Sequence, residues 1–174
     1  EINRGAVKWR NGATGLMEDT YLHDYKNGSV PIAGCTSALS VTVRRSHFRT
    51  YHETLWGNTL MLIEDCLFEL ADNASSDALD FDGAVVGSVI RRTTFRNGPQ
   101  VNTDAIDIGP FGGTTGSTNT IIENCIMHDF PNDKGVSIGE GCYGIVVRDC
   151  VIWKTESGIG VKDSPGGRPP CTAI

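Results

Sequence analysis

Two short segments of the chain carry aspartates at the same positions. Residues 77–82 read Asp-Ala-Leu-Asp-Phe-Asp, and residues 104–109 read Asp-Ala-Ile-Asp-Ile-Gly. Residues 134–139 and 157–162 align with these segments without gaps, and Lys134 takes the place of the leading aspartate. Grouped carboxylates are ligands that calcium prefers, and a lysine with a depressed pKa can act as a base. We therefore expect the chemistry of the protein to lie in these segments.

The segments must be β-strands for their aspartates to act together. Apolar residues stand at the third and fifth places of all four segments, and this period of two predicts strands with one buried face. If the strands stack in parallel about 4.8 Å apart, Asp80 and Asp107 lie side by side on the outer face, with Ser137 next in that column. Close carboxylates need a cation, a raised pKa or nearby counter-charges. The pattern predicts a calcium site at Asp80, Asp82 and Asp107.

A longer repeat contains these strands. Paired aliphatic residues, charged or polar residues, a small residue and an apolar residue recur in order at 41–48, 61–68, 88–95, 120–127 and 145–152. Self-similarity at a period of roughly 20 to 30 residues predicts a solenoid. Parallel strands need a crossover, and no segment has a helical period, so the crossover must be extended. We expect an all-β, single-stranded parallel β-helix with about five or six recognisable coils, each read as strand, corner, strand, corner.

The repeat also divides the chain. Residues 37–164 are expected to form the β-helix, and residues 1–38 an irregular segment or poorly matching first coils. Residues 165–174 are rich in proline and glycine, so they are expected to form a tail or cap.

The composition limits the partners. A net charge of −6 argues against nucleic acid, which requires a basic surface. No apolar run approaches about 20 residues, so no membrane span is expected, and residues 1–10 lack the form of a signal peptide. Six cysteines are compatible with disulfides and an extracellular or cell-surface location. Cys125 and Cys150 share one position of the repeat, where they either pack as thiols or form a bridge.

On these motifs, residues 37–164 resemble the pectin-lyase-like superfamily, whose members are right-handed parallel β-helices. Residues 102–108, Asn-Thr-Asp-Ala-Ile-Asp-Ile, resemble the NTDGIDI motif of polygalacturonase-type glycoside hydrolases. The resemblance implies catalytic carboxylates at Asp104 and Asp133. The family's second paired aspartate is replaced by Lys134, and the place of its Gly-His-Gly coil, residues 156–158, holds no histidine.

The aspartate segments are also similar to pectate-lyase-type enzymes, whose strands supply calcium ligands. That similarity implies that Lys134 or Lys162 removes the C5 proton of a calcium-bound uronate. Residues 133–140 and 158–163 resemble β-helix repeat modules of large secreted bacterial proteins more closely, and this resemblance implies no established reaction.

We therefore predict an extracellular carbohydrate-active protein that binds an acidic polysaccharide, with calcium, on the aspartate face. If it is an enzyme, lyase-type β-elimination is expected, with polygalacturonase-like hydrolysis as the other option. Asp77, Ser137 and Glu140 would contact the substrate. The alternative is a non-catalytic structural or adhesive solenoid that forms homo-oligomers or filaments through its coil ends.

Overall fold

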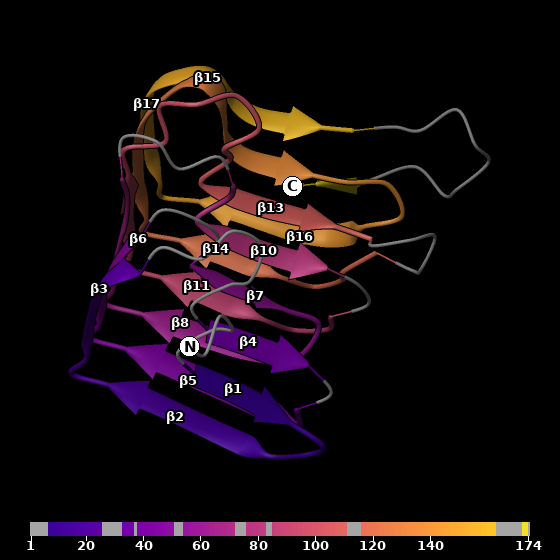
Figure 1. The fold of residues 1–174 in the computed structure, drawn as a ribbon. Helices are drawn as coiled ribbons and strands as arrows, with labels where there is room; N and C mark the ends of the chain where they lie inside the picture. Colours follow the sequence, from indigo (N-terminus) through magenta and orange to yellow (C-terminus); the bar gives the residue numbers. More distant parts are fainter. Residues whose placement is uncertain are drawn as a thin grey trace.

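The protein is built from parallel β-strands (Figure 1). The computed structural model describes residues 7–25, 33–36, 38–50, 54–71, 76–82, 85–110, 116–162 and 172–173. Within these ranges every regular element is a strand and every strand pairing is parallel. The predicted all-β class with parallel strands is confirmed. These ranges contain no helix of the length and apolarity that crossing a membrane requires.

One sheet has seven strands, in the order β18-β16-β14-β11-β8-β5-β2. Its members are β2 (Thr14–Glu18), β5 (Ser40–Arg44), β8 (Leu60–Glu64), β11 (Val89–Arg91), β14 (Ile121–Glu123), β16 (Tyr143–Arg148) and β18 (Thr172–Ala173).

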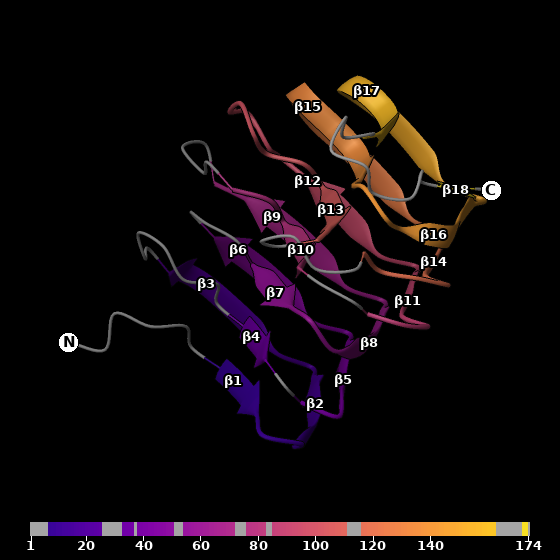
Figure 2. The same cartoon turned by 90° about the vertical axis from the view of Figure 1, so that its right-hand side faces the viewer.

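The other sheet has eleven strands and two arms that meet at one long strand. The first arm holds β1 (Val7–Arg10), β4 (Ala33–Thr36), β7 (Leu55–Gly57), β10 (Leu79–Asp82) and β13 (Ile106–Gly109). The second arm holds β3 (Tyr21–Tyr25), β6 (His47–Thr50), β9 (Leu67–Leu70) and β12 (Thr94–Arg96). The strand β15 (Ile126–Ile138) continues both arms, and β17 (Val151–Val161) pairs with it. Figure 2 shows the two arms side by side.

The sequence predicted two strands in each repeat, but four repeats contribute three: β2–β4, β5–β7, β8–β10 and β11–β13. In the two later repeats, β15 and β17 each form one long strand after the first corner. The stretch at 41–48, for example, is divided into β5 and β6. The division falls at a residue with left-handed backbone in each of the five stretches: Arg45, Asp65, Arg92, Asn124 and Asp149. Asn and Asp tolerate this conformation better than other residues with a side chain, whereas an arginine gives no sign of it in the sequence. The corner therefore could not be recognised, and each stretch was predicted to be a single strand.

Strands of the repeat are present within residues 1–38, which were expected to be irregular or to form poorly matching first coils. β2 pairs in register with β5, and β3 pairs with β6 with a register shift between His23 and Tyr25. The apolar pattern is broken at Gly15, which pairs with Val41. A Cβ atom at Gly15 would lie 2.5 Å from Nε1 of Trp9, so the glycine makes room for that indole against the core. Residues 1–6 lie outside the described part.

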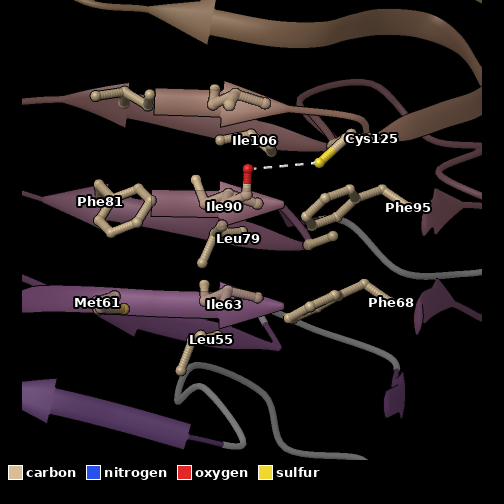
Figure 3. Close-up of a cluster of buried hydrophobic side chains, with 14 of the residues drawn as sticks. Leu55, Met61, Ile63, Phe68, Leu79, Phe81, Ile90, Phe95, Ile106 and Cys125 are labelled. Carbon is tan, nitrogen blue, oxygen red and sulfur yellow. Dashed lines mark hydrogen bonds between the residues drawn. The ribbon is translucent and has the colours of Figure 1, made fainter. Parts of the chain in front are cut away.

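The core lies between the two sheets and is made of columns of stacked side chains (Figure 3). Phe48, Phe68 and Phe95 occupy one position of successive repeats, and their ring centroids are 4.9 Å apart at both steps. This spacing is close to the distance between neighbouring strands, so the backbone register sets the aromatic stacking. Residues 165–174 lie outside the described part except for β18, which pairs with β16.

We expect Phe68→Ala to lower the free energy of unfolding by about 3 to 5 kcal/mol, because it removes the fully buried middle ring of this stack. Urea unfolding followed by circular dichroism measures the change. The control is Leu16→Ala on β2, since Leu16 is 57% exposed, and it should change stability by less than about 0.5 kcal/mol. Equal losses in the two variants would contradict the packing described here.

Candidate functional site

The outer face of three neighbouring strands brings the predicted aspartates together. Asp80 in β10 pairs with Asp107 in β13, and Asp107 pairs with Ser137 in β15. The flanking residues Leu79 and Ile106 are fully buried in the core, so the alternation of the strand turns the polar column outward. This is the stacking that the alignment of the segments predicted. The side chain of Asp82 lies outside the described part, so its place as a calcium ligand stays a prediction.

A buried pair of carboxyl groups lies beside this column. Asp104 precedes β13 and is 4% exposed, and Asp133 in β15 is 7% exposed. The two carboxyl groups lie close enough to shift each other's pKa in opposite directions. Burial, together with the neighbouring Asp133, raises the pKa of Asp104 to about 7. Asp104 is therefore the member of the pair that more readily holds a proton.

Asp133 keeps its negative charge. Burial tends to raise its pKa, but the hydrogen bonds from Asp104 and Lys134 more than offset this effect and hold the pKa below its usual value. The backbone also fixes the pair, because the amide of Lys134 donates to Oδ1 of Asp104 at 2.8 Å. The amide of Asp104 in turn donates to Oδ1 of Asp77 at 2.6 Å. Asp77, predicted to bind substrate, therefore orients Asp104.

Two lysines flank the carboxyl pair. The ammonium of Lys134 contacts Asp133 and lies 3.6 Å from Oδ1 of Asp104. The ammonium of Lys162 lies 4.0 Å from Oδ2 of Asp104 and 3.8 Å from Oδ1 of Asp107. Burial lowers the pKa of Lys134, but Asp133 and Asp104 outweigh it, and the net pKa is raised. Lys134 is thus a protonated cation near neutral pH, which disfavours its predicted role as a base.

Sequence reasoning missed a residue that positions Lys134. Gly160 continues the Asp107–Ser137 column in β17, and a Cβ atom there would lie 2.4 Å from Cδ of Lys134. The absent side chain lets the stem of Lys134 lie across the neighbouring strand. The signal was the Gly-Ile-Gly spacing at residues 158–160, which the sequence analysis treated only as strand alternation.

Two buried polar atoms of the column have no hydrogen-bond partner among the described residues. They are Oδ1 of Asp107 and Oγ of Ser137. A buried polar atom without a hydrogen bond costs about 1 to 3 kcal/mol, and for Oδ1 of Asp107 the ion pair with Lys162 offsets part of this cost. Ser137 itself is fully buried, while the side chain of Lys162 is 45% exposed. The cluster therefore extends from the buried carboxyl pair to Lys162 at the surface. Glu140, which was predicted to contact substrate, follows the end of β15.

Calcium fits this cluster only in part. Asp80 and Asp107 are adjacent, but no group of three His, Cys, Asp or Glu side chains suited to a metal is found among the described residues. Calcium takes six to eight oxygen ligands, so these two carboxylates would have to be completed by a bound ligand and water. In this structure the counter-charge on Asp107 comes from Lys162.

Described residues away from this cluster line further hollows, of which two are considered. One, of about 700 Å³, follows the corner residues Asp19, Arg45, Asp65 and Arg92. Arg45 pairs with Asp19 and Arg92 with Asp65 across it, so its charges are compensated internally. The other, of about 380 Å³, is lined by Asn97, Pro99, Asp129, Pro131 and Lys154. Beside it His128 stacks on Trp153, with ring centroids 4.2 Å apart, a contact that the sequence analysis did not foresee.

The raised pKa of Asp104 makes stability depend on pH. Its folded pKa of about 7 exceeds the ordinary value of 3.8, so its contribution is complete below pH 4 and is lost as the pH rises to 7. We expect the free energy of unfolding to fall by roughly 2 to 4 kcal/mol over this range because of Asp104. Asp133, whose pKa is lowered, contributes its change below pH 4, outside this window.

Urea titrations at several pH values measure this effect. Asp104→Asn keeps a donor toward Asp133 and an acceptor for the Lys134 amide, and it should abolish the fall. Asp149→Asn, which changes an exposed corner carboxylate, should retain it. A wild-type curve that stays flat between pH 4 and 7 would rule out the protonated pair.

Comparison with known proteins found no matching family model, no matching curated protein and no matching solved structure.

Proposed function

We propose that this chain is a secreted, right-handed parallel β-helix that binds an acidic polysaccharide along the outer face of β10, β13 and β15. Support for the β-helix comes from the parallel pairing of each strand with the equivalent strand of the next repeat, and from the core formed by both sheets. The acidic cluster lies on the outer side of the same strands. A polymer that crosses the strands would therefore meet several repeats in turn.

The observation that carries this proposal is the cluster of carboxyl groups and two lysines on this face. Lys162 is the exposed cation, and a uronate carboxylate would form a charge-assisted hydrogen bond with its ammonium. Sugar hydroxyl groups would donate to the accessible part of the Asp107 carboxylate, whose side chain is 26% exposed.

In this proposal, calcium would bridge the aspartates of the outer face and the carboxylates of the polysaccharide. Asp80 and Asp107 would hold it, with Asp82 as the third protein ligand. Bound there, calcium would neutralise the face, draw a uronate carboxylate toward it and acidify the adjacent C5 proton.

Two reactions are compatible with the cluster. Asp104, with a pKa of about 7, suits a proton donor to the leaving oxygen of a glycosidic bond. Hydrolysis would also need a second carboxylate to act on water, and Asp107 is the candidate beyond the buried pair. Elimination would need a base near the C5 proton. Lys162 is the remaining candidate for this role, because Lys134 is held protonated by Asp133 and Asp104.

One observation favours the non-catalytic alternative. Ile159 and Val161 in β17 pair with Val136 and Ile138, which are fully buried, yet they are 46% and 52% exposed. Apolar residues at core positions with this exposure suit contact with a further layer of protein. In this alternative the chain is a structural or adhesive solenoid that associates through such layers, and the acidic face is ordinary solvated surface.

Binding is tested by calorimetric titration with polygalacturonate, with and without calcium. Lys162→Gln should weaken binding about tenfold or more, because an ammonium–carboxylate contact is lost. The control Lys154→Gln changes a 69% exposed lysine in β17 that pairs with Asp129, away from the acidic cluster, and should leave affinity unchanged. Asp80→Ala/Asp107→Ala should abolish the calcium dependence. Equal affinity in wild type and Lys162→Gln would refute the proposed face.

The reaction is tested separately on the same polymer. Reducing ends without ultraviolet absorbance would indicate hydrolysis, and absorbance from unsaturated ends would indicate elimination. If hydrolysis occurs, Asp104→Asn should lower kcat at least a hundredfold while binding persists, because the proton donor is lost. Binding with neither product would leave a glycan-binding module, and absence of binding would favour the structural solenoid.

A further inference from the structure

We propose that Cys125 and Cys150 form a site of reversible two-electron oxidation, where a small-molecule disulfide converts their thiols into a disulfide joining two neighbouring repeats. The site is independent of polysaccharide binding. It lies at the corner between the seven-stranded sheet and the second arm, and the acidic cluster belongs to the first arm.

The backbone brings the two cysteines together. Each follows a left-handed corner residue, Asn124 or Asp149, and stands just before the next strand. The amide of Asn124 donates to the carbonyl of Arg148 at 3.2 Å, and the amide of Val151 donates to the carbonyl of Cys125 at 2.9 Å. These backbone hydrogen bonds fix the two chain segments next to Cys125 and Cys150. Adjacent strands lie about 4.8 Å apart, within the Cα separation that a disulfide accepts.

The two cysteines are already in contact in the reduced protein. Both are free thiols. The amide of Cys125 donates to the sulfur of Cys150 at 3.5 Å. Figure 3 shows the Cys125 sulfur directed into the core, where it donates to the carbonyl oxygen of Ile90 at 3.7 Å. Bond formation therefore needs a rotation of side chains and no rearrangement of strands.

The two thiols differ in reactivity. Cys125 is 1% exposed, whereas Cys150 is only half buried and can be reached by a small molecule. The interaction with Cys125 is the main cause that lowers the pKa of Cys150 to about 7, and burial opposes it. The same interaction, together with burial, raises the pKa of Cys125. Cys150 thus supplies the attacking thiolate, and Cys125 resolves the intermediate.

The exchange is balanced with glutathione disulfide as oxidant. The Cys150 thiolate attacks one sulfur of glutathione disulfide, its S–S bond breaks, and one glutathione leaves as a thiolate that takes up a proton. Cys125 then loses its proton to solvent and attacks the Cys150 sulfur of the mixed disulfide, which releases the second glutathione. Two protein thiols are oxidised, and one small disulfide is reduced to two thiols.

Cys66 provides a control within the same chain. It holds the same position in an earlier repeat, but its column neighbours are Ser46 and Thr93. Burial raises the pKa of Cys66 to about 11, and no thiol stands beside it in the column. Cys66 should therefore stay reduced under conditions that oxidise the Cys125–Cys150 pair. Serine occurs naturally at this position as Ser46, so serine variants of these cysteines are expected to fold.

The folded protein is incubated with mixtures of reduced and oxidised glutathione, and free thiols are then alkylated before tryptic digestion without reduction. Trypsin separates residues 97–134 with Cys125, 135–148 with Cys142 and 149–154 with Cys150. Mass spectrometry should find peptides 97–134 and 149–154 joined, and Cys66 alkylated. Oxidation should also raise the melting temperature by roughly 5 to 10 °C, because the bridge closes a loop between two repeats.

Variants separate this site from general thiol oxidation. Cys150→Ser should abolish the linked peptides and the rise in melting temperature, while Cys66→Ser should preserve both. Three results would overturn the proposal. They are alkylatable Cys125 and Cys150 in fully oxidised glutathione, a bridge from either residue to Cys142, or a Cys125–Cys150 bridge that forms only in denaturing urea.

Discussion

The parallel register between repeats is the constraint on which the rest of the structure depends. At each corner from Asp19 to Asn124 the amide of the left-handed residue donates to a carbonyl of the next repeat. Examples are Arg45 to Glu64 and Asp65 to Arg91, at 3.1 and 3.2 Å. A left-handed residue with a side chain costs about 1 to 2 kcal/mol. The corner hydrogen bonds and the strand pairing on both sides offset this cost, so each corner is held by its neighbours. Equivalent positions are then forced into columns, both inside and outside the core.

Charges along one corner are arranged to select this register. Acidic pairs and arginine pairs alternate from repeat to repeat: Glu18-Asp19, Arg44-Arg45, Glu64-Asp65 and Arg91-Arg92. Each arginine pair contacts the acidic pair of the preceding repeat, and Arg148 contacts Glu123 in the same way. Exposed ion pairs contribute little stability individually. A slip by one repeat would place like charges together, so the alternation disfavours incorrect pairing.

The same stacking concentrates like charges on the outer face. Asp80 is forced beside Asp107, and the approach of Asp104 to Asp133 would place two carboxylates in a buried environment. Repulsion between Asp104 and Asp133 is reduced in two ways: Asp104 tends to keep its proton, and Lys134 lies against Asp133. Such pairs, in which the two pKa values are driven apart, are common at functional sites. The cost of building this cluster is the physical reason to expect a ligand there.

The sequence by itself determined the parallel all-β architecture and the stacking of its columns, because alternation and repeat spacing depend only on local backbone geometry. The adjacency of Asp80 with Asp107, and of Cys125 with Cys150, followed from that spacing alone. Only the tertiary structure decided the corner that divides each long stretch, since Arg45 and Arg92 adopt left-handed backbone only because neighbouring repeats hold them. It also decided how Trp9 replaces the missing side chain at Gly15, and how Gly160 admits Lys134. The contact between Asp104 and Asp133 was also decided only by the tertiary structure. It depends on the path of the chain between strands, and no local sequence pattern specifies that path.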